Sequence, residues 1–92
     1  MQYNRLKDWS VYILQCRDGS LYTGITKDVP TRVRQHNKGK GGAYTRSRLP
    51  VKRIYQEDGL THYEALVREA EIKRLPRIKK EAIISEKNGE VE

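Results

Sequence analysis

The chain has very little cysteine. Cys16 is the one such residue among 92, which excludes an internal disulfide and a cysteine-rich zinc site. No segment approaches the roughly 20 consecutive apolar residues that a membrane-spanning helix requires. Residues 1–8 also lack the apolar stretch of a secretory signal. We therefore expect a protein that stays in the cytoplasm and has no membrane as its partner.

Acidic residues are missing from a long central part of the chain. Between Val29 and Gln56 there is no Asp or Glu, whereas the formal net charge of the whole chain is +7. The cations in this interval are Arg32, Arg34, Lys38, Lys40, Arg46, Arg48, Lys52 and Arg53. Such a surplus favours a phosphate-rich partner, because each Lys or Arg that contacts a phosphate releases bound counterions. The alternatives are an anionic membrane surface, or a solvated basic face that serves solubility alone.

Three segments rich in β-forming residues predict three strands, at residues 10–16, 21–25 and 51–56. The first helix is predicted to begin after an N-cap at Asp28, with Pro30 in its first turn, and to end near Lys38. The glycine-rich segment that follows, residues 37–47, is interpreted as a mobile loop.

A second helix is predicted to open with a capping box, in which Thr61 is the N-cap and Glu64 is the third helical residue. This helix ends before Pro76, because proline cannot continue it. A last helix is predicted around residues 78–83, and we expect it to fray from Glu86 onward.

Together these segments predict a single α+β domain with the element order β-β-α-β-α-α. The expected architecture is an α/β sandwich, in which helices flank a small antiparallel three-stranded sheet. A chain of this length buries only about 60–65% of its unfolded surface, so its core is small. We place the domain at residues 9–85 and treat residues 1–8 and 86–92 as flexible extensions.

Tyr12 and Tyr22 lie on the two strands of the predicted hairpin. A two-residue turn at Asp18 and Gly19 would place the two phenols on opposite faces of the sheet. A three-residue loop with Gly19 in the left-handed conformation reverses this parity, so that Leu14 faces Tyr22 and the phenols become diagonal neighbours. We predict the three-residue loop, because paired phenols make chemical sense in a site. The alternative is two ordinary strand tyrosines.

Arg32 and His36 are four residues apart on the first predicted helix, so they project from the same side. A guanidinium fork suits a phosphate oxygen, and a histidine can carry protons near neutral pH. Asn37 follows the pair and could add a hydrogen-bond donor. The alternative is a polar helix face without any chemistry.

Glu69 falls where the second helix should bury its apolar stripe. With Ala65 at zero on a helical wheel, Ile72 lies at about −20°, Glu69 at about 40° and Leu66 at about 100°. A buried carboxylate is costly unless it is paired or binds a metal. Two interpretations remain open: an ion pair with Lys73, or a carboxylate in a cleft that holds a hard divalent cation such as Mg²⁺.

The glycine-rich loop also carries cations and an aromatic residue. Gly39, Gly41 and Gly42 match neither a P-loop nor a dinucleotide fingerprint, because a strand follows them, and no small-molecule cofactor is predicted. The loop is interpreted as a flexible basic arm, in which Tyr44 could stack on an unpaired base. The residues predicted to bind nucleic acid are Arg34, Lys38, Lys40, Tyr44, Arg46, Arg48 and Lys73.

These residues together resemble the GIY-YIG nuclease domain. The first motif reads Ser10-Val11-Tyr12 and the second reads Tyr22-Thr23-Gly24, so both tyrosines and the glycine are kept. Arg32 follows that glycine by eight residues, and the run from Arg32 to Asn37 is similar to the structure-specific endonuclease branch. Glu69 matches the metal-binding glutamate of the family.

The resemblance covers nearly the whole chain, and it is greatest to the small stand-alone bacterial members of the family. The departures are Ser10 and Val11 in place of Gly-Ile, and Thr23 in place of Ile. They leave the tyrosines intact, so they alter little of the expected chemistry. No residue matches the C-terminal asparagine of some branches, so that role is unfilled or is taken by Lys73.

The resemblance implies an endonuclease that hydrolyses DNA phosphodiester bonds with Mg²⁺ or Mn²⁺. Its catalytic residues would be Tyr12, Tyr22, Arg32, His36 and Glu69. Glu69 would hold the metal at the scissile phosphate, and Arg32 would bind a non-bridging oxygen. Tyr12 would take the proton of the attacking water, directly or through His36, with its pKa lowered by Arg32 and the metal. Tyr22 would orient the water or the phosphate; which tyrosine is the base stays open.

DNA structure rather than base sequence is predicted to direct the enzyme, with branched or single-stranded DNA as its partner and DNA repair as the expected process. One alternative is a catalytically silent nucleic-acid-binding module of the same fold. Another is a structural protein, such as a ribosome-associated basic domain. Salt-dependent binding without any metal dependence would favour these alternatives.

Overall fold

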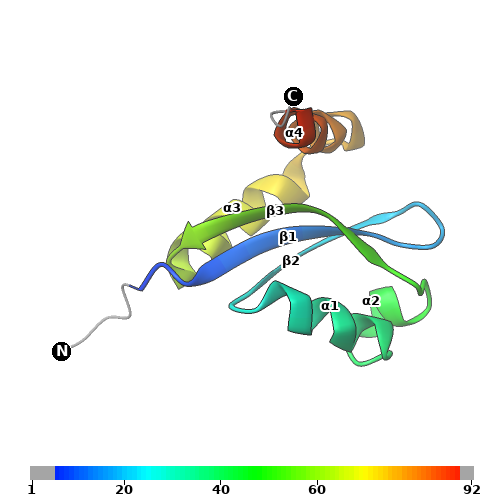
Figure 1. Cartoon of the computed structure of the whole chain (residues 1–92). Coiled ribbons are helices and arrows are strands. Elements are labelled where there is room, and N and C mark those ends of the chain that lie inside the picture. Colours follow the sequence, from blue (N-terminus) through cyan, green and yellow to red (C-terminus); the bar gives the residue numbers. More distant parts are fainter. Residues whose placement is uncertain (1–5, 90–92) are drawn as a thin grey trace.

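The computed structural model describes residues 6–89, so the predictions for residues 1–5 and 90–92 lie outside the described part of the chain. It has a three-stranded antiparallel sheet with helices on both sides, which confirms the predicted α+β class (Figure 1). The strand order is β2-β1-β3. The elements are β1 (Trp9–Gln15), β2 (Leu21–Thr26), α1 (Val29–Asn37), α2 (Ala43–Arg46), β3 (Lys52–Leu60), α3 (His62–Arg74) and α4 (Arg77–Gly89).

The hairpin formed by β1 and β2 has the odd loop that places its two tyrosines on one face. Leu14 pairs with Tyr22 in the sheet register. A backbone hydrogen bond of 2.9 Å from Cys16 to Ser20 closes a three-residue loop, and Gly19 within it has a φ of 86°. A residue with a Cβ would be strained at that φ, so glycine is what permits this parity. The predicted register and the diagonal arrangement of the phenols are confirmed.

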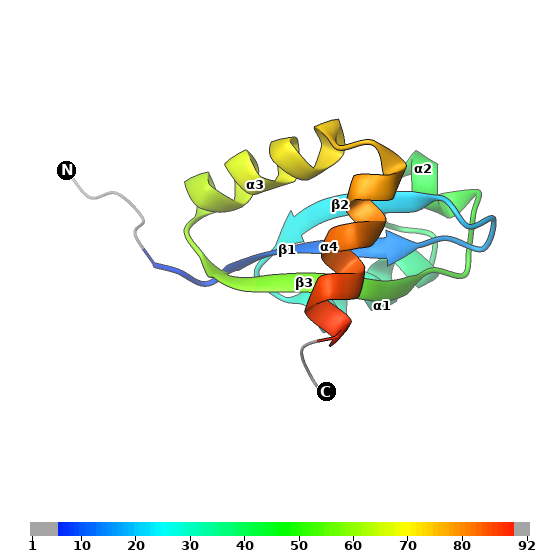
Figure 2. The ribbon, with the colours of Figure 1, turned by 90° about the horizontal axis from the view of Figure 1, so that it is seen from above.

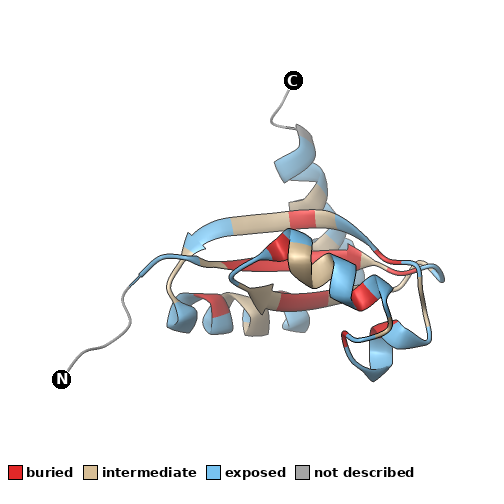
Figure 3. Ribbon diagram, turned by 60° about the horizontal axis from the view of Figure 1, so that its bottom comes forward, coloured by how far each residue is buried: buried red, intermediate tan, exposed pale blue. Residues whose placement is uncertain are grey.

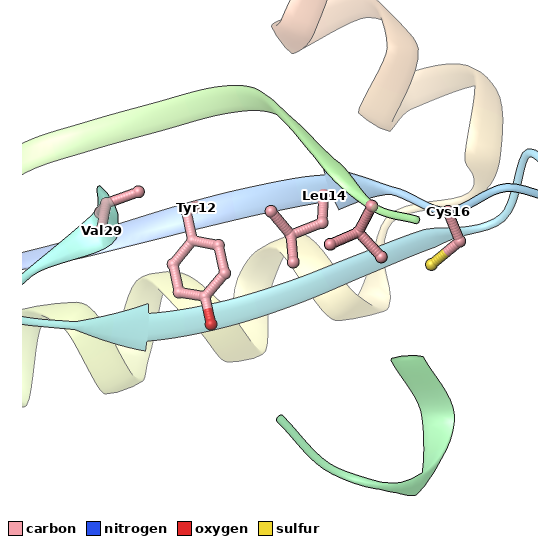
Figure 4. Close-up of a cluster of buried hydrophobic side chains, with 5 residues drawn as sticks. Tyr12, Leu14, Cys16 and Val29 are labelled. Atoms are coloured by element: carbon pink, nitrogen blue, oxygen red, sulfur yellow. The ribbon is translucent and has the colours of Figure 1, made fainter. Parts of the chain in front are cut away.

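The central strand β1 separates two small apolar clusters, because successive side chains of a strand point to opposite faces. The cluster on the side of α1 contains Tyr12, Leu14, Cys16, Val29 and Val51 (Figure 4). The cluster on the side of α3 contains Val11, Ile13, Tyr55 and Ile72. Figure 3 shows the buried residues concentrated along the sheet, with most of the helical surface exposed. A core this thin leaves room for polar side chains close to the sheet.

Two helix starts follow the predicted capping signals. The Asp28 carboxylate accepts a hydrogen bond of 3.2 Å from the backbone N–H of Thr31 and caps α1. Thr61 and Glu64 form the reciprocal capping box of α3. The first N–H groups of a helix have no partner inside the helix, so each of these side chains satisfies one. The end of α3 before Pro76 is also as predicted.

Two element boundaries differ from the prediction. Strand β3 continues past Gln56 to Leu60, because Leu60 pairs with Trp9 at the start of β1. Helix α4 continues to Gly89 instead of fraying from Glu86. Neither α4 nor any other helix within residues 6–89 is long and apolar enough to cross a membrane.

The segment between α1 and β3 has regular structure, contrary to the prediction of an irregular loop over residues 37–47. It contains α2, which lies beside α1 (Figure 1). The Lys40 N–H donates to the carbonyl of Gln35 at 2.9 Å, and the Gly39 N–H donates to that of His36 at 2.9 Å. These bonds turn the chain tightly at the end of α1 and bring α2 back against that helix.

Candidate active site

The side chain of Tyr12 lies over Gly24, its partner on the edge strand β2. A Cβ at Gly24 would be 2.7 Å from the Tyr12 phenol oxygen and 3.1 Å from Cε2 of Tyr22. Packed interiors do not allow such approaches, so only glycine leaves room for both phenols. Steric contact therefore explains why the second motif has glycine at position 24. The space that glycine leaves is occupied by the Tyr12 hydroxyl.

The Tyr12 hydroxyl is 3.1 Å from Nε2 of His36, a fully buried histidine of α1. The Nδ1 atom of the same ring is 2.8 Å from the hydroxyl of Thr45 on α2. That hydroxyl also donates to the Gly42 carbonyl at 3.5 Å, which leaves its oxygen to accept a proton from Nδ1–H. This arrangement favours the tautomer in which Nε2 accepts the Tyr12 proton. One buried chain of hydrogen bonds thus joins β1, α1 and α2.

Gly41 packs directly against the His36 ring. A Cβ at this position would overlap Nδ1 and its neighbouring ring carbons. The Gly41 carbonyl accepts a hydrogen bond of 3.4 Å from Nη2 of Arg32, whose Nη1 donates to Oε1 of Gln35 at 3.0 Å. The turn after α1 therefore positions both predicted residues of that helix. A guanidinium has five N–H donors, so several remain for an incoming phosphate.

The surroundings of Tyr12 and His36 favour the neutral form of each side chain. Burial raises the pKa of Tyr12 to about 12, Tyr22 adds to that effect, and Arg32 opposes it only in part. Burial, and after it the charge of Arg32, lowers the pKa of His36. Burial therefore outweighs the expected lowering of the Tyr12 pKa by Arg32. Removing a phenolate from water destabilises it more than one nearby cation stabilises it.

Tyr22 extends the site toward α2. Its ring meets His36 edge-on with centroids 5.1 Å apart, and it lies 6.2 Å from the nearly parallel ring of Tyr44. The guanidinium of Arg48 lies 3.9 Å from the centroid of the Tyr44 ring and covers one of its faces. Arg48 also donates to Asp18 at 3.2 Å. This arginine therefore ties α2 to the hairpin loop and takes a ring face that we expected a base to use.

Glu69 lies at the edge of the buried stripe of α3 and not near its middle. Ala65 and Ile72 are fully buried against the sheet, whereas Leu66 is 43% exposed. The sheet contacts the side of α3 that carries Ala65 and Ile72, so the buried stripe is centred away from Leu66 and Glu69 flanks it. The Glu69 side chain is 20% exposed, and its carboxylate is 3.2 Å from Nζ of Lys73. The ion pair with Lys73 is thus present, and the Glu69 carboxylate that forms it is half-buried.

The donor set near Tyr12 fits a hard divalent ion held by a single carboxylate. Within residues 6–89, no three His, Cys, Asp or Glu side chains come together as a possible metal site. Glu69 is close enough to Tyr12 for its charge to raise the pKa of that phenol. Mg²⁺ is commonly bound through one or two carboxylates, with water and substrate phosphate as its other ligands. One half-buried glutamate near the Tyr12 phenol meets the protein's share of that requirement.

The predicted nucleic-acid-binding residues differ in whether their side chains are already engaged by other groups of the protein. Among these predicted residues, Lys38, Lys40 and Arg46 are exposed and have no side-chain partner within residues 6–89. Arg34 donates to the Thr31 hydroxyl at 3.0 Å, but its side chain is exposed. Asn37 does not donate near His36: its amide exchanges two hydrogen bonds with the backbone of Val51 and holds the start of β3.

Two parts of this site had no clear signal in the sequence. No pattern in the sequence marks Thr45, and Gly41 stands out only as one glycine of the loop after the first helix. Both lie in the segment interpreted as a basic arm, and both meet His36 only because α2 folds back on α1. A threonine that orients a histidine nine positions earlier has no periodic pattern by which it could be found.

Comparison with known proteins agrees with the resemblance seen in the motifs. The profile of the GIY-YIG catalytic domain matches residues 8–82. A UPF0213 protein of Staphylococcus aureus is 54% identical over 77 residues, which are 84% of this chain and 94% of that protein. The names of these relatives state no reaction and no substrate.

Two solution NMR structures are similar to this chain in both sequence and fold. The UPF0213 protein BH0048 from Bacillus halodurans is 46% identical with a TM-score of 0.58, and the match covers 88% of this chain and 86% of that one. The protein EF2693 from E. faecalis is 37% identical with a TM-score of 0.60, and the match covers 98% and 94% of the two chains.

Proposed function

The chain belongs to the GIY-YIG catalytic domain family, and on that premise we propose that it is an endonuclease that hydrolyses DNA phosphodiester bonds with Mg²⁺ or Mn²⁺. One observation carries the proposal: the buried Tyr12 hydroxyl is hydrogen-bonded to His36 beside Arg32. A packed core has no structural need for a tyrosine–histidine–threonine chain, and an apolar residue would fill the same space without desolvating polar groups. Proton transfer during catalysis would account for these buried hydrogen bonds between Tyr12, His36 and Thr45.

In the proposed reaction, the attacking water gives a proton to the Tyr12 oxygen while Tyr12 passes its own proton to Nε2 of His36. The oxygen of the water forms a bond to phosphorus, and the bond from phosphorus to the leaving oxygen breaks. Neither side chain is charged at rest, so Tyr12 has a proton to give and Nε2 of His36 has a free lone pair to accept it. The hydrogen bond from Nδ1 to Thr45 holds the imidazole in the required orientation.

Other residues around the relay would bind the phosphate. The free N–H donors of Arg32 would hold a non-bridging oxygen and stabilise the charge that develops in the transition state. Tyr22, at the rim of the site, would orient the water or the phosphate. Glu69 would hold the divalent ion, whose chemistry is to polarise the phosphate and to stabilise the leaving oxygen. Lys73 would then exchange its carboxylate partner for a phosphate.

We propose that the DNA strand runs over the surface of α1 and α2 and that its structure, not its base sequence, selects it. The cations offered to its backbone are Lys38, Lys40 and Arg46, with Arg34 and Lys73 at the margins and Tyr44 at the rim. Phosphate contacts of this kind position a strand without reading bases. Branched or single-stranded DNA is the proposed substrate, which suits a role in DNA repair.

The test is cleavage of end-labelled single-stranded, nicked, flapped and branched DNA with Mg²⁺ or Mn²⁺. Glu69→Gln removes the charge that would hold the metal and keeps the size of the side chain. Glu71→Gln is the matched control, because Glu71 is on the same helix and also makes one ion pair, with Arg68 at 3.3 Å. Broadening of protein NMR signals by Mn²⁺ reports metal binding without any need for turnover.

We expect metal-dependent cutting by the wild type and by Glu71→Gln, and none by Glu69→Gln, with DNA affinity retained in all three. Localised Mn²⁺ broadening should disappear in Glu69→Gln alone. Equal, salt-sensitive binding by all three proteins without any cutting would reject the enzyme and leave the catalytically silent binding module.

A further inference from the structure

A pocket beside Tyr22 opens at the edge of the sheet. Its volume is about 300 Å³, and it is lined by Leu21, Tyr22, Thr23, Tyr44, Lys73 and Lys80. Three of these residues belong to the edge strand β2, and the others come from α2, α3 and α4. Figure 2 shows the junction of α3 and α4 and the helix α2 lying on the side of β2. The pocket thus lies where elements from both faces of the sheet meet at its edge.

The charge of this pocket is positive. Its lining holds two ammonium groups, of Lys73 and Lys80, and no carboxylate. Lys80 is half-buried, and no side-chain hydrogen bond or ion pair within residues 6–89 engages it. Lys73 reaches the pocket from the next helix, where it also pairs with Glu69 at 3.2 Å. A partly desolvated cation without a counter-charge favours an anion as its ligand.

The walls of the pocket suit a sugar and a base more than a simple ion. The rings of Tyr22 and Tyr44 are tilted by 26° with centroids 6.2 Å apart, and Leu21 adds an apolar surface. Aromatic walls favour nucleotides of any base, because every base has a π face. Tyr22 belongs to both sites, so a strand whose cleaved phosphate lies at Tyr12 would pass this pocket next.

We propose that this pocket is a subsite for the nucleotide adjacent to the cleaved bond, with the phosphate of that nucleotide held by Lys80 and Lys73. This inference rests on the proposed nuclease function and adds Lys80, on α4, to the DNA-binding surface. A nucleotide held at the edge of a sheet between side chains cannot stay base-paired. The subsite therefore requires an unpaired nucleotide beside the cut, which would make the enzyme prefer single-stranded or flapped DNA.

The test combines Lys80→Met with DNA in which one phosphate at a time is replaced by an uncharged methylphosphonate. Methionine keeps the apolar stem of the lysine and removes its charge. Lys79→Met is the matched control, because Lys79 precedes it on the same helix, is exposed and does not line the pocket. Affinity is measured with chelator present, so that no cleavage occurs, across a series of salt concentrations. Thermal unfolding checks that both variants are folded.

We expect Lys80→Met to weaken binding of flapped DNA several-fold and to reduce the salt slope by about one, while Lys79→Met matches the wild type. One methylphosphonate position, next to the cleaved bond, should weaken binding by the wild type and weaken binding by Lys80→Met much less, because only Lys73 then remains to contact that phosphate. Equal affinities and slopes for all three proteins would overturn the subsite, even where Glu69-dependent cleavage is intact. Lys80-dependent binding without any cleavage would keep the pocket as a nucleotide-binding site and reject the nuclease, and absence of DNA binding would reject both.

Discussion

The phenol oxygen of Tyr12 lies 3.1 Å from Nε2 of His36, although 24 positions separate the two residues along the chain. Three further residues maintain this contact: Gly24 leaves room for the phenol, Gly41 for the imidazole, and Thr45 holds the far side of the ring. Desolvation keeps both partners neutral. The proposed proton chemistry therefore depends on a pair that packing, rather than a local motif, brings together.

Replacing Tyr12 by Phe keeps the buried ring and removes the hydroxyl that bonds to His36. Because proton transfer by a positioned side chain contributes about 10²–10⁴-fold, we expect the single-turnover cleavage rate to fall at least about 100-fold. Affinity for flapped DNA should stay unchanged. Tyr63→Phe is the control, since that phenol is 74% exposed on α3. A Tyr12→Phe protein that cuts at the wild-type rate would exclude the relay.

Replacing Gly24 by Ala should destabilise the protein by about 1–3 kcal/mol, as expected for overpacking in a filled core. The new Cβ would meet the Tyr12 phenol oxygen at 2.7 Å and its Cζ at 2.9 Å. In a Tyr12→Leu background both of these atoms are gone, so the same substitution should cost much less. Denaturant unfolding of the four proteins gives the coupling energy, and additive costs would show that the phenol is not the obstacle.

Replacing Thr45 by Val removes a buried hydroxyl and keeps the shape of the side chain. Nδ1 of His36 then loses its partner at 2.8 Å, and we expect about 1–3 kcal/mol of lost stability. Cleavage should fall more than stability predicts, because the ring is free to take the other tautomer. Thr45→Ser restores the hydroxyl, and it should recover the rate and the ¹⁵N chemical shifts of the ring. Failure of serine to recover either would contradict a positioning role.

Acid should destabilise the protein through His36. Burial holds the pKa of His36 below its ordinary value of 6.5, so the unfolded chain binds this proton at a higher pH than the folded protein does. Unfolding then takes up a proton, and the stability present above pH 6.5 is lost progressively as the pH falls below that value.

The melting temperature of the wild type should therefore fall between about pH 7.5 and about pH 5.5. The fall should be smaller for His36→Gln, which has no imidazole to protonate at that position. His62→Gln serves as the control for the exposed histidine and should follow the wild type. Parallel curves for wild type and His36→Gln would show that His36 does not titrate in this range.

Arg46 and Arg48 should separate DNA binding from stability. Arg48 bonds to Asp18 and to the Tyr44 carbonyl and covers the Tyr44 ring, whereas Arg46 is exposed. Arg48→Ala should cost about 1 kcal/mol of unfolding free energy, the combined value of an exposed ion pair and a cation–π contact. Arg46→Ala should leave stability unchanged and reduce the salt slope of DNA binding by about one. If Arg46→Ala lowered stability and Arg48→Ala lowered the salt slope instead, Arg48 would be the DNA-binding residue and Arg46 the stabilising one.

Features that depend on short-range chemistry could be predicted from the sequence. Asp28 caps the helix that follows it, and Thr61 and Glu64 form their capping box, because the donors they satisfy lie within three residues. Gly19 permits the hairpin loop that puts Tyr12 and Tyr22 on one face, because glycine accepts the left-handed conformation that this loop contains. The motif tyrosines and the family followed from these local patterns.

Features that depend on distant partners could not be predicted in this way. The segment before β3 has the composition of a loop, yet it forms α2. This helix is held in place because Thr45 hydrogen-bonds to His36 and Gly41 packs against the same ring. The length of β3 depended on Trp9, and the face of α3 depended on which residues the sheet covers. Composition alone grouped Arg46 with Arg48, although only one of them is free of side-chain partners within residues 6–89.

The sequence by itself determined the arginine and histidine one turn apart and the motifs that identify the family, because each follows from spacing within a single element or hairpin. It left two hairpin loops open, and the register of the sheet decided that the two tyrosines share a face. Only the tertiary structure decided that Tyr12 meets His36, that both are neutral, and that Lys80 lies beside Tyr22. The physical reason is that desolvation and charge depend on all the elements packed around a group, and spacing along one chain segment does not specify them.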